Sequence, residues 1–252
     1  MKLNNLLTLL LLAPFTSSFA ADGQVATPTE TVQRIAVRFH LVTDMVMTKE
    51  GVEMTPWLTP EIIKKTVMPE INRIWSTAKI EWTLRDVSSE TTRSENRKEV
   101  ISYVEKSARD SEGKGDPERI RKLQSILNLE KEDPLAVNLY VIPYLGGTSQ
   151  GNASPQQKRI LLAQWTDKPS GGARPPVKCL VVETGDFHQG SFSRTAAHEL
   201  GHILSLKHPP KNTPPLNRLM GGSKPGYDLT LEEKTMARKS ASALSSKFSI
   251  DK

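Results

Sequence analysis

The stretch "RTAAHELGHILSLKHPP", Arg194 to Pro210, contains three of the five histidines in the chain. His198 and His202 are four residues apart, so a helix would place both imidazole rings on one face. Two imidazoles at that separation can bind one zinc ion, and the neighbouring Glu199 can reach a water on that ion. The flanking residues are apolar and suit a buried helix, where such polar groups need a partner. The segment therefore predicts a helix that holds a metal ion.

His208 is the candidate for a third ligand, because catalytic zinc uses three protein ligands and keeps one position open. His208 follows His202 by six residues. On a continued helix it would lie about 9 Å further along the axis and could not reach the same ion. Pro209 disfavours helical geometry at His208. We therefore predict that the helix ends at or beside Ser205 and that the chain then folds back.

Two other assignments of this site stay open from the residues alone. Glu232 or Glu233 could supply the third ligand from a later helix, as in the gluzincin class of peptidases. Alternatively, the zinc could merely stabilise a non-catalytic extracellular binding protein. Glu199 argues against that second possibility, because a structural site needs no general base and normally has a fourth protein ligand.

The sequence "HELGHILSLKH" resembles the long zinc signature of the metzincin metallopeptidases, His-Glu-x-x-His-x-x-Gly-x-x-His. Ser205 stands where the signature has glycine. Downstream, "NRLMGG" resembles the Met-turn of this family, with Met220 as its methionine. The segment "INRIWSTAKIEWTL" is similar to the first long helix and second strand of matrixin-like members. The resemblance extends over about residues 34–85 and 135–245.

This resemblance implies a zinc endopeptidase with Zn²⁺ on His198, His202 and His208 and with Glu199 as the general base. A protein or peptide substrate would pair with an exposed edge strand, for which "RILLAQW" is the candidate by resemblance. Tyr227 has the wrong spacing from Met220 to assist the reaction, so we expect ordinary loop packing there. Ser205 would take the positive φ that glycine adopts more easily, at a cost of about 1 kcal/mol.

The N-terminus predicts export. "MKLNNLLTLLLLAPFTSSFA", residues 1–20, has a basic start, an apolar run and small residues before a cleavage point, which is the pattern of a signal peptide. The apolar run is too short to span a bilayer, so we expect no stable membrane insertion after its removal. Residues 21–33 are polar and predict a linker or a short pro-segment. The expected location is therefore secreted or periplasmic.

Composition indicates a soluble globular chain without a nucleic-acid partner. The formal net charge is +6 over 252 residues, but basic and acidic residues are interspersed, which is typical of a solvated surface. Cys179 is the single cysteine, so no disulfide can form within the chain. It lies in the apolar run "VKCLVVE", where we interpret it as a buried structural thiol.

The remaining patterns predict one domain, residues 34–247, of the α/β (α+β) class, and the resemblance implies that it is a zinc metallopeptidase domain. Strand, helix and strand are followed by a charged helical insertion at about 88–134, three strands, the histidine helix and a last helix. This order favours a mixed, mostly parallel twisted sheet. The resemblance adds an antiparallel edge strand, an active-site helix, a Met-turn and a C-terminal helix, as in a metzincin-like catalytic domain.

Four local expectations follow from spacing. Thr59 should cap a helix that Pro69 kinks or splits. His40 alternates with the apolar residues of its strand, so we expect it at the surface. The two helices of the insertion should form a solvated pair. In the last helix, Thr230 and Glu233 should form a capping box, with an apolar stripe at Leu231, Met236 and Leu244.

Overall fold

The computed structural model describes residues 31–93, 95–110, 116–146, 149–166, 177–178, 191–210, 213–214, 217–221 and 226–248. The predicted signal peptide and Cys179 lie outside these residues. Nothing in the described part of the chain therefore bears on those two predictions.

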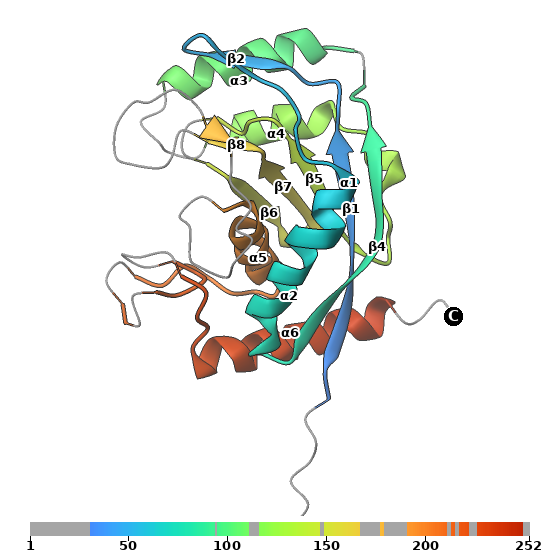
Figure 1. Ribbon diagram of the computed structural model, residues 1–252, viewed down its shortest axis with the longest axis vertical. Coiled ribbons are helices and arrows are strands. Elements are labelled where there is room, and N and C mark those ends of the chain that lie inside the picture. Colours follow the sequence, from blue (N-terminus) through green and yellow to red (C-terminus); the bar gives the residue numbers. More distant parts are fainter. Residues whose placement is uncertain are drawn as a thin grey trace, which may run out of the picture. The chain divides into compact units, whose positions relative to one another are not determined.

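A five-stranded mixed sheet is the centre of the described structure (Figure 1). Its strands, in spatial order, are β4 (Ile80–Glu90), β1 (Gln33–Val42), β5 (Val137–Ile142), β7 (Arg159–Ala163) and β6 (Gly151–Ser154). The pairs β4–β1, β1–β5 and β5–β7 are parallel, and β6 pairs with β7 antiparallel. This arrangement confirms the predicted fold class, a mostly parallel sheet with an antiparallel edge strand.

The identity of that edge strand differs from the prediction. "RILLAQW" was expected at the edge, but β7 lies between β5 and β6, and all five of its residues are buried. The edge strand is β6, "GNAS", whose four residues are small or polar and show no apolar run. A strand that is buried on both faces has apolar residues at nearly every position, so its sequence is a continuous apolar run. A short strand of small residues has no such pattern, because it is held by backbone pairing.

One face of the sheet packs against α2 (Met68–Ser76) and α5 (Phe192–Ile203). Thr59 caps the preceding α1 (Pro60–Ile62), as predicted, by accepting a hydrogen bond from Ile62 N–H at 3.3 Å. A π-helical turn, η1 (Ile63–Val67), separates α1 from α2. Pro69 lies in the first turn of α2 and cannot donate a backbone hydrogen bond, so the helix is interrupted where Pro69 predicted it.

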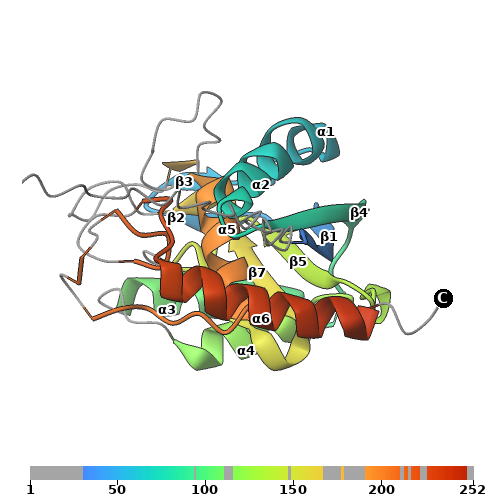
Figure 2. The ribbon, with the colours of Figure 1, turned by 90° about the horizontal axis from the view of Figure 1, so that it is seen from below.

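The opposite face is covered by α3 (Arg97–Asp110) and α4 (Pro117–Ser125), with a 3₁₀ turn, η2 (Leu129–Lys131), after them. In Figure 2, α4 and α2 lie on opposite sides of the sheet. The two helices form a pair at the surface, as expected, but their inner side is not solvated and forms a second apolar cluster with β5 and β7. Its helical members include Val100, Val104, Leu123, Ile126 and Leu127.

His40 is buried for the same reason, which corrects its predicted surface position. Its side chain is fully buried beneath the helical layer and stacks on Tyr140, with ring centroids 4.4 Å apart. His40 Nδ1 hydrogen-bonds Glu90 Oε1 at 2.7 Å, and Nε2 donates to Asn138 Oδ1 at 3.0 Å. The alternation along β1 is real, but its second face is an interior that contains a polar network.

The last helix, α6 (Leu231–Phe248), begins with the predicted capping box. Glu233 Oε2 accepts from Thr230 N–H at 2.8 Å, and Thr230 Oγ1 accepts from Glu233 N–H at 3.2 Å. The predicted apolar stripe is wrong at Leu231 and Met236, which are 79% and 43% exposed. Ala237 and Ala241 are buried instead, because small side chains let the helix approach the sheet closely.

Short elements complete the described structure: the hairpin strands β2 (Met47–Lys49) and β3 (Val52–Met54), the 3₁₀ turn η3 (Pro155–Gln157), and the paired strands β8 (Trp165–Thr166) and β9 (Val177–Lys178). Within the described helices, none combines the length and the apolar character that crossing a bilayer requires.

Candidate metal centre

Helix α5 contains His198 and His202 and lies in the centre of the fold. Ser191 caps its N-terminus by accepting from Arg194 N–H at 3.5 Å. The helix is buried over most of its length, and Trp75 Nε1 of α2 donates to the carbonyl of Ala197 at 3.2 Å. Its position between α2 and β6 is thus set by the core, and His202 lines a cleft beside that core.

The helix ends at Ile203, and Ser205 takes the left-handed conformation predicted for it, with φ of 68°. Leu206 N–H donates to Gly201 O and Ser205 N–H donates to His202 O, both at 3.0 Å. These two bonds define a Schellman motif, in which the residue after the cap is usually glycine. The chain therefore reverses immediately after the helix, which is the change of direction that His208 requires.

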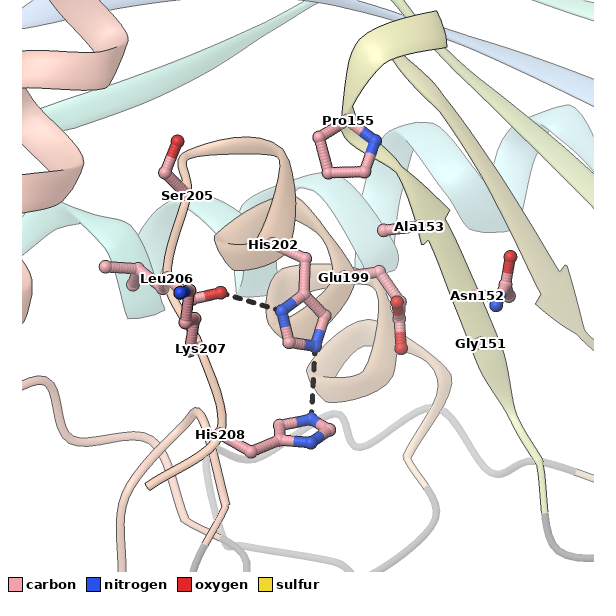
Figure 3. A pocket seen from close by; sticks show the side chains of 10 residues that line it. All are labelled: Gly151, Asn152, Ala153, Pro155, Glu199, His202, Ser205, Leu206, Lys207 and His208. Atoms are coloured by element: carbon pink, nitrogen blue, oxygen red, sulfur yellow. Dashed lines mark hydrogen bonds between the residues drawn. The ribbon is translucent and has the colours of Figure 1, made fainter. Parts of the chain in front are cut away.

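The structure brings the three histidines together. His208 Nε2 lies 2.9 Å from His198 Nε2. It also lies 3.1 Å from His202 Nε2 (Figure 3). Zinc held tetrahedrally with Zn–N bonds of 2.0–2.1 Å separates its nitrogen ligands by about 3.3 Å. Among the described residues, these three histidines form a group that could hold a metal ion, because one nitrogen from each lies within 4.8 Å of the other two. The nitrogens therefore form a triangle of nearly the size that one metal ion needs.

The hydrogen bonds on the far side of the rings favour a metal in this triangle. His198 Nδ1 hydrogen-bonds the carbonyl of Leu219 at 2.7 Å, and His202 Nδ1 bonds the carbonyl of Leu206 at 2.8 Å. A carbonyl only accepts, so both Nδ1 atoms carry the proton and both Nε2 atoms of the neutral rings carry lone pairs. His208 Nε2 can offer one proton to these two acceptors. A cation at the centre satisfies all three nitrogens, so the donor set fits a metal.

Burial reinforces the neutral form of the rings. It lowers the pKa of His198 to about 3, with the nearby Arg194 charge adding to the effect. Burial also lowers the pKa of His208, and the proximity of His202 contributes. Neutral imidazole is the form that binds metal ions.

Met220 lies directly against the histidine helix. Its side chain is fully buried, and a Cβ at Gly201 would overlap its sulfur. Trp75 packs against the same spot, 3.6 Å from the position of that Cβ. Gly201 is therefore needed for close packing, and the turn that contains Met220 brings the Leu219 carbonyl to His198.

Glu199 lies between His202 and strand β6 (Figure 3). Burial raises its pKa to about 8, while a hydrogen bond from Ala153 N–H and the charge of Arg194 oppose that rise. Gly151 leaves room for the side chain, since a Cβ there would lie 2.5 Å from Glu199 Cγ. The carboxylate thus lies at the border of a cleft of about 500 Å³, which the edge strand forms together with His202 and His208.

The alternative third ligands lie elsewhere. Glu233 is buried in an ion pair with Arg218 at 2.5 Å and completes the capping box of α6. Glu232 is exposed, and neither residue belongs to the histidine cluster. Tyr227 packs against the core and lies under the guanidinium of Arg73, 4.6 Å from its ring centroid, as ordinary loop packing would place it.

Sequence reasoning missed the residues that surround the ligands. Gly151 and Ala153 are on a strand that composition could not reveal. Leu219 and Leu206 act through backbone carbonyls, which any residue type supplies. Arg194 had a usable signal, because it precedes His198 by four residues and therefore shares its face of a largely apolar helix.

No family model and no curated protein matches this chain. Among solved structures, it is similar to metalloproteinase-II from Bacteroides fragilis, with 13% sequence identity and a TM-score of 0.39. The similarity covers 84% of this chain and 55% of that protein's chain, so this chain spans about half the length of that protein.

Proposed function

We propose that this chain is a zinc-dependent endopeptidase of the metzincin type. The observation that carries the proposal is the convergence of three imidazole Nε2 atoms beside the buried carboxyl group of Glu199, in a cleft bordered by a sheet edge. His198, His202 and His208 would hold the ion. When bound, zinc in a three-histidine site polarises a carbonyl oxygen and makes a water molecule more acidic.

Glu199 is the proton carrier in this proposal. Its carboxylate would take a proton from the attacking water and pass it to the nitrogen of the leaving amine. The hydrogen bond from Ala153 N–H and the packing of Gly151 hold the carboxylate in place. A base that is already oriented does not have to be repositioned during the reaction.

Strand β6 supplies the substrate-binding edge. Ala163 N–H of β7 donates to Gln150 O at 2.8 Å, so alternate residues of the antiparallel pair face β7. The backbone groups of Gly151 and Ala153 then face outward, and because Ala153 N–H bonds Glu199, Gly151 and the Ala153 carbonyl are the groups proposed to pair with a substrate. An extended peptide can add to this edge by backbone pairing, which tolerates many side chains.

The proposal also includes export, which rests on the signal-peptide pattern of residues 1–20 alone. Zinc peptidase activity outside the cytoplasm would suit a chain that forms no internal disulfide, because the metal and the two apolar clusters can stabilise the fold.

The test is metal analysis of the purified chain followed by cleavage of an unbiased peptide library, with and without a chelator. We expect one zinc per chain and cleavage that the chelator abolishes. Glu199→Gln should keep the zinc but reduce hydrolysis by about 10²–10⁴-fold, the usual contribution of a general base. Glu232→Gln, on the exposed side of α6, is the matched control and should cleave like the wild type.

Two results would contradict the proposal. Full activity of Glu199→Gln would remove this residue from the chemistry. A wild-type chain that binds zinc but cleaves no peptide would favour the non-catalytic binding protein instead.

A further inference from the structure

Arg194 is a half-buried cation close to the candidate metal centre, and the proposed reaction does not use it. It lies one turn before His198 on α5, and burial lowers its pKa to about 10. Its guanidinium donates to backbone carbonyls on the segment that contains Met220. Nη2 donates to Leu219 O at 2.8 Å and to Arg218 O at 3.5 Å, and Nε donates to Gly226 O at 3.0 Å.

The carbonyl of Leu219 connects this arginine to the metal centre. The same oxygen accepts from Arg194 Nη2 and, at 2.7 Å, from His198 Nδ1. A carbonyl oxygen has two lone pairs and can accept both bonds. The arginine therefore fixes the position of the group that orients the His198 ring.

We propose that Arg194 is a positioning residue for the metal centre, which holds the Met220 turn against α5 and orients His198 through Leu219 O. The inference rests on the proposed zinc site and names one of its supporting groups. The planar guanidinium is suited to this task because its fork of N–H groups can reach several carbonyls at once, whereas an ammonium group is a single point of charge.

The charge and the hydrogen bonds of Arg194 have opposite effects on zinc affinity. A positive charge near the site repels a divalent cation, so removing the charge alone would strengthen zinc binding. Losing an outer hydrogen-bond partner of a metal ligand commonly weakens binding by about 10–100-fold. A decrease in affinity after removal of the guanidinium is therefore the sign of positioning.

The experiment uses the full chain and zinc ion as the probe. Zinc affinity is measured by competition with a chromophoric chelator for the wild type, Arg194→Met and Arg194→Lys. The control is Arg159→Met. Arg159 is a buried arginine on β7, and its side chain pairs with Glu132. NMR of the chain with ¹⁵N-labelled histidine reports the Nδ1–H signal of His198, and that of His202 is the internal reference because its partner is Leu206 O.

We expect Arg194→Met to weaken zinc binding by about 10-fold, the lower end of that range because Leu219 O itself remains, and to shift the His198 signal while the His202 signal stays in place. Arg159→Met should lower the melting temperature and leave zinc affinity within about twofold, because it contacts nothing in the site. If Arg194→Met does not fold, Arg194→Lys decides, since it retains charge without the fork. We expect the lysine variant to lose zinc affinity and to shift the His198 signal as well.

The inference is overturned if Arg194→Met, or Arg194→Lys where the methionine variant does not fold, binds zinc as tightly as the wild type or more tightly. It is also overturned if the signals of both histidines move alike, or if Arg159→Met weakens zinc binding equally. These readouts do not depend on catalysis. A chain that cleaves no peptide but shows the predicted pattern refutes the proposed function and leaves the role of Arg194 intact.

Discussion

Ser205→Gly should make the protein more stable. Ser205 is exposed and has φ of 68° at the end of α5, so the substitution removes backbone strain and no buried contact. A left-handed conformation costs an L-residue about 1–2 kcal/mol, and glycine loses about 0.5–1 kcal/mol more backbone entropy on folding. The difference is a net gain of about 0.5–1 kcal/mol, or about 2 °C in melting temperature for a domain of this size.

Urea unfolding followed by circular dichroism measures this gain. The midpoint should rise with an unchanged slope, because the surface exposed on unfolding is the same. Ser205→Val should move in the opposite direction, since a β-branched residue tolerates positive φ worst. The same order should hold with zinc and with chelator. A glycine variant that is less stable than the wild type would show that the helix does not end in this turn.

Glu50→Gly is a matched control outside the site. Glu50 has φ of 51° and is exposed in the two-residue turn between β2 and β3, before Gly51. Relief of the same kind of strain should give a similar gain in stability of about 0.5–1 kcal/mol. The two variants together separate the cost of a positive φ from any effect on the metal centre.

Two further predictions concern polar groups that hold the layers together. His40→Leu should destabilise the fold by about 3–5 kcal/mol in urea unfolding, because the buried Glu90 carboxyl group loses the imidazole and keeps the Ser88 hydroxyl as a hydrogen-bond donor. Adding Glu90→Gln should recover part of the loss, and a loss below about 1 kcal/mol would contradict the buried His40–Glu90 pair. Burial alone would raise the pKa of Asp44, but hydrogen bonds from Thr92 and Arg97 outweigh it and hold this pKa below its ordinary value of 3.8. The stabilisation by Asp44 is therefore complete above about pH 4 and is lost as the pH falls through the lowered value, so the stability difference between wild type and Asp44→Asn should shrink below pH 4; a difference that is constant from pH 7 to pH 2 would contradict this.

The candidate ligands could be predicted from sequence because their chemistry depends on side chains at fixed spacing. Two histidines one turn apart share a helix face whatever the rest of the fold does. The third histidine could reach the same ion only if the helix ended near residue 205. Pro209 indicated such an end, because it disfavours helical geometry at His208. The structure meets it through a serine in a glycine conformation. Local rules were sufficient here because every residue involved lies within one segment.

The fold was predictable where burial leaves a periodic pattern and was not where tertiary packing decides. The parallel strands are apolar runs, and both capping motifs are local. His40 was misplaced because alternation identifies two faces but not what covers the second one. Leu231 and Met236 were misplaced because α6 packs through alanines, whose small side chains give a weak signal. The edge strand β6 is defined by its neighbour, so its own four residues contain little information.

The same distinction applies to the atoms that orient the candidate metal ligands. His198 and His202 each donate Nδ1–H to a backbone carbonyl, of Leu219 and of Leu206. Since every residue type supplies a carbonyl, a motif that specifies both ligands gives no indication of the groups that fix their tautomers. Those groups are determined by two turns, one held by the Schellman motif at Ser205 and the other by the side chain of Arg194. The turn at Ser205 depends on backbone geometry, and glycine should strengthen it. The turn at Met220 depends on a guanidinium, so no backbone substitution should compensate for the loss of Arg194.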